Sequence, residues 1–268
     1  LTTSKGVLTI TSVSAPDGGG VVTYGYSYTL TAALTHTGQG EINPLSDTVT
    51  MSVSDTTGDS DATPGAIVIS IVDDVPVATD DVDSVTEGLG NIADGNVFTA
   101  SGGTDGNLTD GVADTIGADG AAAGGAVTGA RVGTEAGGGV LTAVAGPTVI
   151  SGVYGNLTIN PNGSYSYALK TASIPGDVTS ETFTYQITDG DGDTDLAQLV
   201  ITLYQDQLTP DVTGSTATVY EDGLADGVQH GATSETATGT FTVDGNNTGY
   251  SVTLTADNAN TLTNPAVG

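Results

Sequence analysis

The clearest hydrophobic pattern in the chain covers residues 181–203, where two alternating stretches flank an acidic turn. Every second residue is apolar on either side of the turn: Phe183, Tyr185 and Ile187 before it, and Ala197, Leu199, Ile201 and Leu203 after it. Alternation with a period of two is typical of half-buried β-strands. The pattern therefore predicts two strands joined by the acidic turn.

The turn itself reads DGDGDTD and places a carboxylate at every second position, namely at Asp189, Asp191, Asp193 and Asp195. Carboxylates this close repel one another unless a cation lies among them. Calcium takes six to eight oxygen ligands, and the glycines allow the backbone to fold around an ion. The turn is not an EF-hand loop, because Thr194 and Val200 stand at the sixth and twelfth positions. We expect a calcium-binding turn of a β-domain; the alternative is a solvated acidic turn without an ion.

An earlier stretch repeats this pattern. Residues 47–61, DTVTMSVSDTTGDSD, match residues 181–195, ETFTYQITDGDGDTD, position by position. Asp55, Asp59 and Asp61 stand where Asp189, Asp193 and Asp195 stand, and Thr57 replaces Asp191. The separation is 134 positions, and the same separation relates Glu87 to Glu221. A repeat at a fixed period indicates an array of similar structural units, and we expect Asp55, Asp59 and Asp61 to form a second calcium turn.

A shorter echo precedes each copy. GVLTI at 6–10 is followed by YSYTL at 26–30, and GNLTI at 155–159 is followed by YSYAL at 165–169. The NPNG that joins the later pair is a hairpin turn composition. In the earlier pair the connection is longer and passes through Pro16 and the glycines at 18–20.

These repeats divide the chain into three parts. Residues 1–75 are expected to be the C-terminal part of one β-sandwich repeat, residues 76–207 a complete repeat, and residues 208–268 the N-terminal part of the next. The last part would be completed by residues 1–75 of a neighbouring copy, which predicts head-to-tail contacts and leaves open a self-assembling filament. The alternative is that the ends of the sequence bear no relation to the domain boundaries.

Acidic linkers mark both boundaries, at 71–88 and 203–223. An ion shared at such a junction would fix the angle between neighbouring domains; the alternative role of these charges is solubility. The candidate ligands are Asp73, Asp74, Asp80, Asp81 and Glu87 in the first linker and Asp206 and Glu221 in the second.

Charge excludes several classes of function. The chain has 32 acidic residues against three basic ones and a formal net charge of −29. Phosphate binding needs Lys and Arg, so nucleic acid is excluded as a partner, and attachment to anionic membranes is disfavoured. No apolar run approaches the ~18 residues of a membrane span. The absence of cysteine removes disulfides and thiolate sites.

No catalytic constellation stands out. His36 and His230 are the only histidines, and neither lies in a nucleophile motif. Carboxylates are so abundant that any pair of them is uninformative. We therefore expect no enzymatic activity. The irregular Gly- and Ala-rich segment 94–139 is expected to form long loops, and it motivates the alternative of a module that binds glycan or protein.

The two copies resemble a known family. GNLTINPNGSYSYAL with ETFTYQITDGDGDTDLAQLVITL, and SDTVTMSVSDTTGDSDATPGAIVISIVDDVPVATDD, are similar to the VCBS-type and related Ig-like or cadherin-like tandem repeats of large RTX adhesins, which Gram-negative bacteria export by type I secretion. The resemblance implies β-sandwich domains in a linear array, stiffened by calcium. It also implies an extracellular extender on the bacterial cell surface or in a biofilm matrix. The calcium role falls on the aspartates of the two acidic turns.

Overall fold

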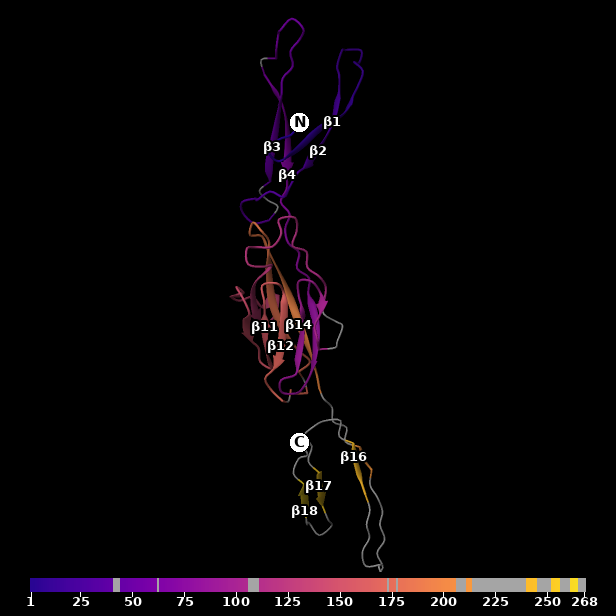
Figure 1. Cartoon of the computed structure of the whole chain (residues 1–268), viewed down its shortest axis with the longest axis vertical. Coiled ribbons are helices and arrows are strands. Elements are labelled where there is room, and N and C mark those ends of the chain that lie inside the picture. The colour runs from indigo at the N-terminus through magenta and orange to yellow at the C-terminus, as the bar shows by residue number, and fades with distance from the viewer. Residues whose placement is uncertain are drawn as a thin grey trace, which may run out of the picture. The chain divides into compact units, whose positions relative to one another are not determined.

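The computed structural model of the chain describes residues 1–40, 44–61, 63–105, 111–172, 174–176, 178–205, 211–213, 240–244, 252–255 and 261–264 (Figure 1). The protein is all-β, as predicted, and one short 3-10 helix, Glu135–Gly137, accompanies the strands. The chain divides into two compact units, Leu1–Gln205 and Asp206–Gly268. Within the described ranges, no helix has the length and apolar character that crossing a membrane requires.

Two antiparallel hairpins open the first unit, and together they are called the paired hairpins. They consist of β1 (Gly6–Val13) with β2 (Tyr24–Leu30), and of β3 (Leu45–Met51) with β4 (Gly65–Ile71). In the described part of the chain each hairpin is a two-stranded sheet of its own.

The remaining strands of the first unit form its body, which contains two five-stranded sheets (Figure 1). The first sheet has the order β10 (Thr148–Ser151), β11 (Gly155–Ile159), β12 (Ser164–Leu169), β6 (Ile92–Asn96) and β7 (Ser101–Gly102). The second has the order β5 (Asp81–Thr86), β14 (Thr194–Tyr204), β13 (Ser180–Thr188), β8 (Val127–Val132) and β9 (Thr142–Ala143). Neighbouring strands are antiparallel except β5, which runs parallel to β14 at the edge.

Both sheets of the body contribute to one hydrophobic core. The first sheet supplies Leu157 and Tyr167, and the second supplies Phe183 and Ile201, all of them buried. The rings of Tyr167 and Phe183 meet edge to face with centroids 5.8 Å apart, a favourable geometry for aromatic pairs. Two sheets that share one core in this way are consistent with a β-sandwich.

The segment 94–139 contributes more to this core than its composition predicts. It contains β8, which pairs with the central strand β13 and buries Val127 and Ala130. Glycine and alanine have little intrinsic preference for strands. Pairing with β13 and packing in the core therefore decide the conformation of β8, and the sequence pattern does not reveal it.

The paired hairpins repeat hairpins β11–β12 and β13–β14 of the body in the same cross-strand register. The corresponding pairs are Gly6↔Leu30 with Gly155↔Leu169, and Asp47↔Ile69 with Glu181↔Ile201. Register is set by which face of each strand is buried. The shared register therefore means that the two copies present corresponding apolar faces.

A contact between a glycine, a tyrosine and an acid joins the two hairpins of each copy, and it is called the Gly–Tyr–acid contact. Its members are Gly6, Tyr28 and Asp47 in the first copy and Gly155, Tyr167 and Glu181 in the second. The Tyr28 hydroxyl donates to Asp47 Oδ2 at 2.5 Å, and the Tyr167 hydroxyl donates to Glu181 Oε2 at 2.6 Å. A Cβ on either glycine would lie within 2.5 Å of the tyrosine ring, so only glycine fits beneath it.

The two copies differ in how far their apolar residues are covered. Equivalent positions in the first and second copies are exposed as follows: Ile10 51% against Ile159 0%, Tyr26 47% against Tyr165 4%, and Leu30 46% against Leu169 3%. In the body, β6 flanks β12, β8 flanks β13 and β5 flanks β14. In the described part of the chain the paired hairpins thus lack these flanking strands, and their core face is partly open: Leu8, Val49 and Ile71 are buried, whereas Ile10, Tyr26 and Leu30 are exposed.

The second unit is described in four short strands. β15 (Asp211–Thr213) pairs with β16 (Thr242–Asp244), and β17 (Val252–Thr255) pairs with β18 (Thr261–Asn264). Both pairs are antiparallel. β16 and β17 lie in the stretches GTFTVDG and GYSVTLTA, whose alternation is typical of strands.

Candidate metal centre

The acidic turn between β13 and β14 is closed by its own first aspartate. Asp189 Oδ1 accepts hydrogen bonds from the backbone N–H of Gly192 at 3.0 Å and of Asp193 at 2.8 Å. Gly192 has a φ of 111°, which favours glycine. A Cβ on Gly190 would lie 2.4 Å from the carbonyl oxygen of Asp119. The glycines of DGDGDTD therefore shape the turn and let the loop around Asp119 approach it.

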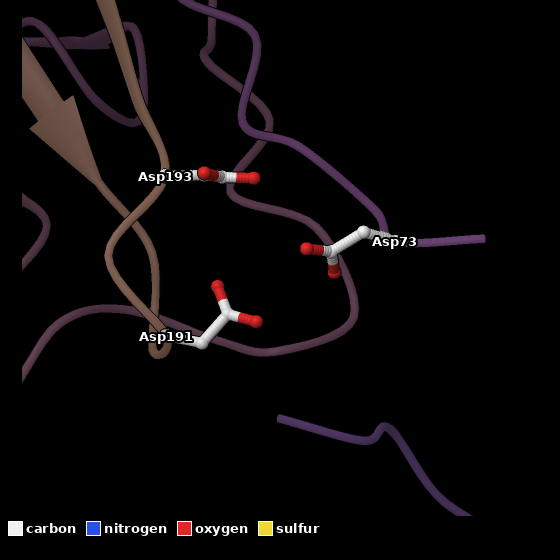
Figure 2. Close-up of side chains that lie close together, drawn as sticks. All are labelled: Asp73, Asp191 and Asp193. Atoms are coloured by element: carbon white, nitrogen blue, oxygen red, sulfur yellow. The ribbon is translucent and has the colours of Figure 1, made fainter. Parts of the chain in front are cut away.

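The turn meets the first acidic linker. Single carboxylate oxygens of Asp73, Asp191 and Asp193 all lie within 4.8 Å of one another. Figure 2 shows the three side chains pointing toward a common point, Asp191 and Asp193 from the turn and Asp73 from a separate stretch of chain. The structure therefore brings together two predicted groups of ligands, one from the turn and one from the linker.

A second group shares a member with the first. Single carboxylate oxygens of Asp119, Asp189 and Asp191 also lie within 4.8 Å of one another. The two groups are called the five-aspartate centre, which comprises Asp73, Asp119, Asp189, Asp191 and Asp193.

Three oxygens of this centre are buried without a hydrogen-bond partner: Asp189 Oδ2, Asp191 Oδ1 and Asp193 Oδ2. Asp189 and Asp193 are 1% and 2% exposed. Buried polar atoms are nearly always paired, because burying one without a partner costs free energy. Hard divalent cations such as calcium bind carboxylate oxygens directly. The donor set therefore fits a calcium ion, which would supply the missing partner.

The loop at residues 31–40 orients the other oxygens of the same carboxylates. The backbone N–H of His36 donates to Asp191 Oδ2 at 2.9 Å, and that of Gly40 donates to Asp193 Oδ1 at 2.7 Å. The imidazole Nε2 of His36 lies 3.9 Å from Asp73 Oδ1. The loop between the two hairpins of the first copy therefore donates backbone hydrogen bonds to the turn, and its His36 side chain lies beside Asp73.

Burial acts against the charged state of this centre. It raises the pKa of Asp189, and it also raises the pKa of Asp119, to which the negative charge of Asp191 adds. Both effects follow from removing carboxylates from water and placing them beside other carboxylates. A bound cation would reverse the effect by favouring the ionised forms.

A pocket of about 350 Å³ lies beside Asp193. Its lining includes Gln39, Gly40, Pro76 and Asp195. An ion site needs a path of entry as well as ligands, and this pocket lies next to one ligand of the centre.

The remaining predicted ligands of the turn and first linker accept hydrogen bonds from backbone N–H groups outside the five-aspartate centre. Asp195 Oδ2 accepts from Ala78 N at 2.8 Å, Asp74 Oδ2 from Ala118 N at 2.7 Å, and Glu87 Oε2 from Ile174 N at 3.1 Å. Asp80 accepts from both the backbone and the side-chain amide of Gln198. These carboxylates join segments of the body and do not belong to the five-aspartate centre.

Asp81 lies in a separate buried cluster. Its Oδ2 accepts from the Tyr185 hydroxyl at 2.9 Å and its Oδ1 accepts from Val112 N at 3.0 Å. Tyr185 also lies 3.1 Å from Asp114 Oδ2. Burial raises the pKa of Asp81 to about 7 and that of Asp114 to about 6. Because both Asp81 oxygens already accept hydrogen bonds, Asp81 has no unpartnered oxygen of the kind that marks the five-aspartate centre as an ion site.

The turn of the first copy is organised differently. Asp55 Oδ1 accepts from the Thr57 N–H and hydroxyl and from Asp59 N, which lowers the pKa of Asp55. Asp55, Asp59 and Asp61 are exposed, and they belong to neither ion-sized group among the described residues. Asp206 and Glu221, the candidates in the second linker, lie outside the described residues.

Asp119 is the one member of the centre that the motif analysis misses. It stands 70 positions before Asp189 and in no acidic motif. In the sequence, Asp119 is distinguished only by lying in the irregular segment 94–139, which motivates a glycan- or protein-binding module and not a metal site. The sequence matches no protein-family model and no curated protein.

Proposed function

We propose that the chain is a calcium-stiffened extender segment, built from tandem Ig-like or cadherin-like β-sandwich repeats, of an extracellular bacterial adhesin or matrix fibre. The observation that carries the proposal is the meeting of Asp73, from the segment between the two copies, with Asp191 and Asp193 of the body. An ion held there would tie the linker to the body. The junction between repeats would then lose its freedom to bend.

The paired hairpins support the tandem arrangement. They have the register and the Gly–Tyr–acid contact of the body, and their core positions Ile10, Tyr26 and Leu30 are exposed. We propose that the front half of a repeat in a second copy of this chain covers that face. The second unit follows a complete repeat and carries the second linker motif, VYEDG, which matches VTEG at 85–88. The contact between copies is therefore head to tail.

The net charge of −29 supports a need for cations. Such a charge destabilises a compact state by self-repulsion, and bound divalent ions relieve it. Extracellular calcium modules bind with dissociation constants of ~10⁻⁴ to 10⁻³ M. Sites of that affinity fill outside cells and empty under chelation.

The alternative function, a glycan- or protein-binding module based on 94–139, has less support. The described parts of this segment include strands of both sheets and the loop that hydrogen-bonds to Asp74 and Asp81. These contacts favour a structural role for the segment.

Calcium dependence of stability tests the proposal. With a dissociation constant near 10⁻⁴ M, about 5 mM calcium stabilises the fold by ~2 kcal/mol, which raises Tm by roughly 4–8 °C. Asp193→Ala should abolish the calcium-dependent rise, whereas Asp55→Ala, at the equivalent position to Asp189 in the first copy, should retain most of it. Circular dichroism melting in calcium and in chelator measures both.

Small-angle scattering tests the stiffening directly. The maximum dimension of the full chain should be larger in calcium than in chelator, and Asp193→Ala should remove the difference. Identical melting and scattering in the two buffers would reject the calcium part of the proposal.

A further inference from the structure

We propose that the five-aspartate centre holds two calcium ions and that Asp191 bridges them. The inference rests on the proposed function, since it specifies how the calcium of the junction is bound. One ion would lie among Asp73, Asp191 and Asp193, and the other among Asp119, Asp189 and Asp191.

Each of the two proposed ion positions includes a buried aspartate with one carboxylate oxygen that has no hydrogen-bond partner. Asp193 belongs to the first group and Asp189 to the second. The Oδ2 of each has no hydrogen-bond partner, and the two residues are 2% and 1% exposed. A single ion satisfying only one group would leave the other oxygen buried without a partner. Two ions satisfy both.

Asp191 has the geometry of a shared ligand. It is the only residue common to both groups among the described residues. Its Oδ2 is oriented by the N–H of His36, and its Oδ1 has no hydrogen-bond partner. Calcium binds oxygen at 2.3–2.6 Å, so two ligands of one ion lie up to about 5 Å apart. The 4.8 Å limit within each group meets this requirement.

Charge also favours a pair of ions. The five carboxylates carry five negative charges in their ionised forms, and one divalent ion would leave three of them uncompensated. A second divalent ion leaves about one. The nearest basic group is the His36 imidazole beside Asp73, and in the described structure Lys5, Arg131 and Lys170 donate to carbonyl or hydroxyl oxygens elsewhere. Uncompensated charge costs most where the dielectric constant is low.

The two positions tie different segments to the turn. The first includes Asp73 of the linker, and the second includes Asp119 of the loop that approaches Gly190. Occupation of the first would hold the junction, and occupation of the second would hold the loop. Because Asp191 serves both, binding at one position orders a ligand of the other and favours cooperative filling.

Counting bound calcium tests this assignment. Equilibrium dialysis of the full chain at saturating calcium compares each variant with the wild type, so that ions bound elsewhere cancel. Asp191→Ala should lose two ions, and Asp73→Ala and Asp119→Ala should lose one each. Asp80→Ala, which removes a carboxylate bonded to Gln198, is the matched control and should lose none.

The outcomes separate this inference from the proposed function. Loss of a single ion in Asp191→Ala overturns the pair and leaves a one-ion junction. Loss of none removes the calcium centre altogether, and with it the calcium part of the proposed function.

A measurement on the wild type covers the case in which a variant fails to fold. Two ions that share a carboxylate lie about 4 Å apart. Terbium and europium bound together should therefore show strong energy transfer, which Asp80→Ala retains. Absence of transfer in the wild type would also overturn the pair.

Discussion

At the scale of single residues, the aspartates of this chain fall into two physical classes. Those of the five-aspartate centre have buried oxygens without partners, whereas both oxygens of Asp81 are hydrogen-bonded. The Tyr185 hydroxyl lies near Asp81, Asp114 and the Thr79 carbonyl but has one proton to donate. A proton on Asp81 or Asp114 would supply a second donor. This arrangement agrees with the raised pKa of both groups.

The buried Asp81–Asp114–Tyr185 cluster predicts that the calcium-free protein loses stability as the pH rises. The pKa of Asp81 is raised from 3.8 to about 7 and that of Asp114 to about 6. At pH values between the ordinary pKa of 3.8 and these raised pKa values, the folded state binds more protons than the unfolded state. The free energy of unfolding therefore falls from about pH 4 to pH 7. One pKa unit corresponds to ~1.4 kcal/mol. The pKa of Asp81 lies about two units above pH 5, so Asp81 alone contributes a decrease of about 3 kcal/mol between pH 5 and pH 8.

Urea unfolding at pH 5 and pH 8, both in chelator, measures this decrease. Asp81→Asn keeps an acceptor for Val112 N and removes the titration of Asp81, so the decrease in stability between pH 5 and pH 8 should become smaller. Asp80→Asn, on the neighbouring residue, should leave the dependence in place. Equal slopes for wild type and Asp81→Asn would contradict the assignment.

At the scale of elements, the repeated unit is a pair of hairpins joined by the Gly–Tyr–acid contact. In the body this contact crosses from β12 of one sheet to β13 of the other. Glu181 also accepts from the backbone N–H of Val153, Tyr154 and Gly155. The acid therefore fixes the first sheet relative to the second.

Removing the tyrosine hydroxyl should destabilise each copy through this contact. Tyr167→Phe loses a hydrogen bond to a charged acceptor, a contribution of ~1.5–3 kcal/mol. Tyr28→Phe should cost less, since Tyr28 is only half-buried whereas Tyr167 is fully buried. Chemical denaturation of both variants, with Tyr204→Phe on an exposed tyrosine as the control, measures the difference. If the Tyr167→Phe protein is as stable as wild type, the Gly–Tyr–acid contact does not stabilise the fold.

At the scale of the whole molecule, the open core face of the paired hairpins is the feature that bears on assembly. The apolar side chains of Ile10, Tyr26 and Leu30 are about half exposed there, whereas their counterparts in the body are buried. Exposed apolar patches of this kind mark interaction sites. A head-to-tail contact between different surfaces forms a ring when its rotation closes and an open chain when it does not, and an extender requires the open chain.

Self-association of the full chain follows from this face. Sedimentation at increasing concentration should show a mass that rises above that of one chain. Ile10→Asp should keep the protein monomeric, while Val140→Asp, at a position 93% exposed and outside the face, should associate like wild type. A wild-type protein that remains monomeric at every concentration would reject completion by a second copy.

Much of the fold follows from local sequence. The alternation around Phe183 and Leu199 predicts β13 and β14, and the repeat at 134 positions predicts that a similar hairpin stands earlier in the chain. Both conclusions depend on short-range periodicity, which a strand must show whenever one of its faces is buried.

Part of the candidate site was also predictable. DGDGDTD identifies three of its aspartates, and the acidic linker identifies Asp73 among several candidates. Sequence alone cannot rank Asp73 above Asp74 or Asp80, because the choice depends on which carboxylate the folded linker turns toward the acidic turn.

Tertiary structure alone decided the rest. It brought Asp119 to the turn, directed Asp195 and Asp81 to other partners, and made a core strand of β8, which lies in the Gly- and Ala-rich segment 94–139. The physical reason is the same in each case. Periodicity encodes which face of a strand is buried, whereas a cluster of ligands depends on distances between segments far apart in the chain. Those distances are set by the packing of the two sheets and of the loops that join them.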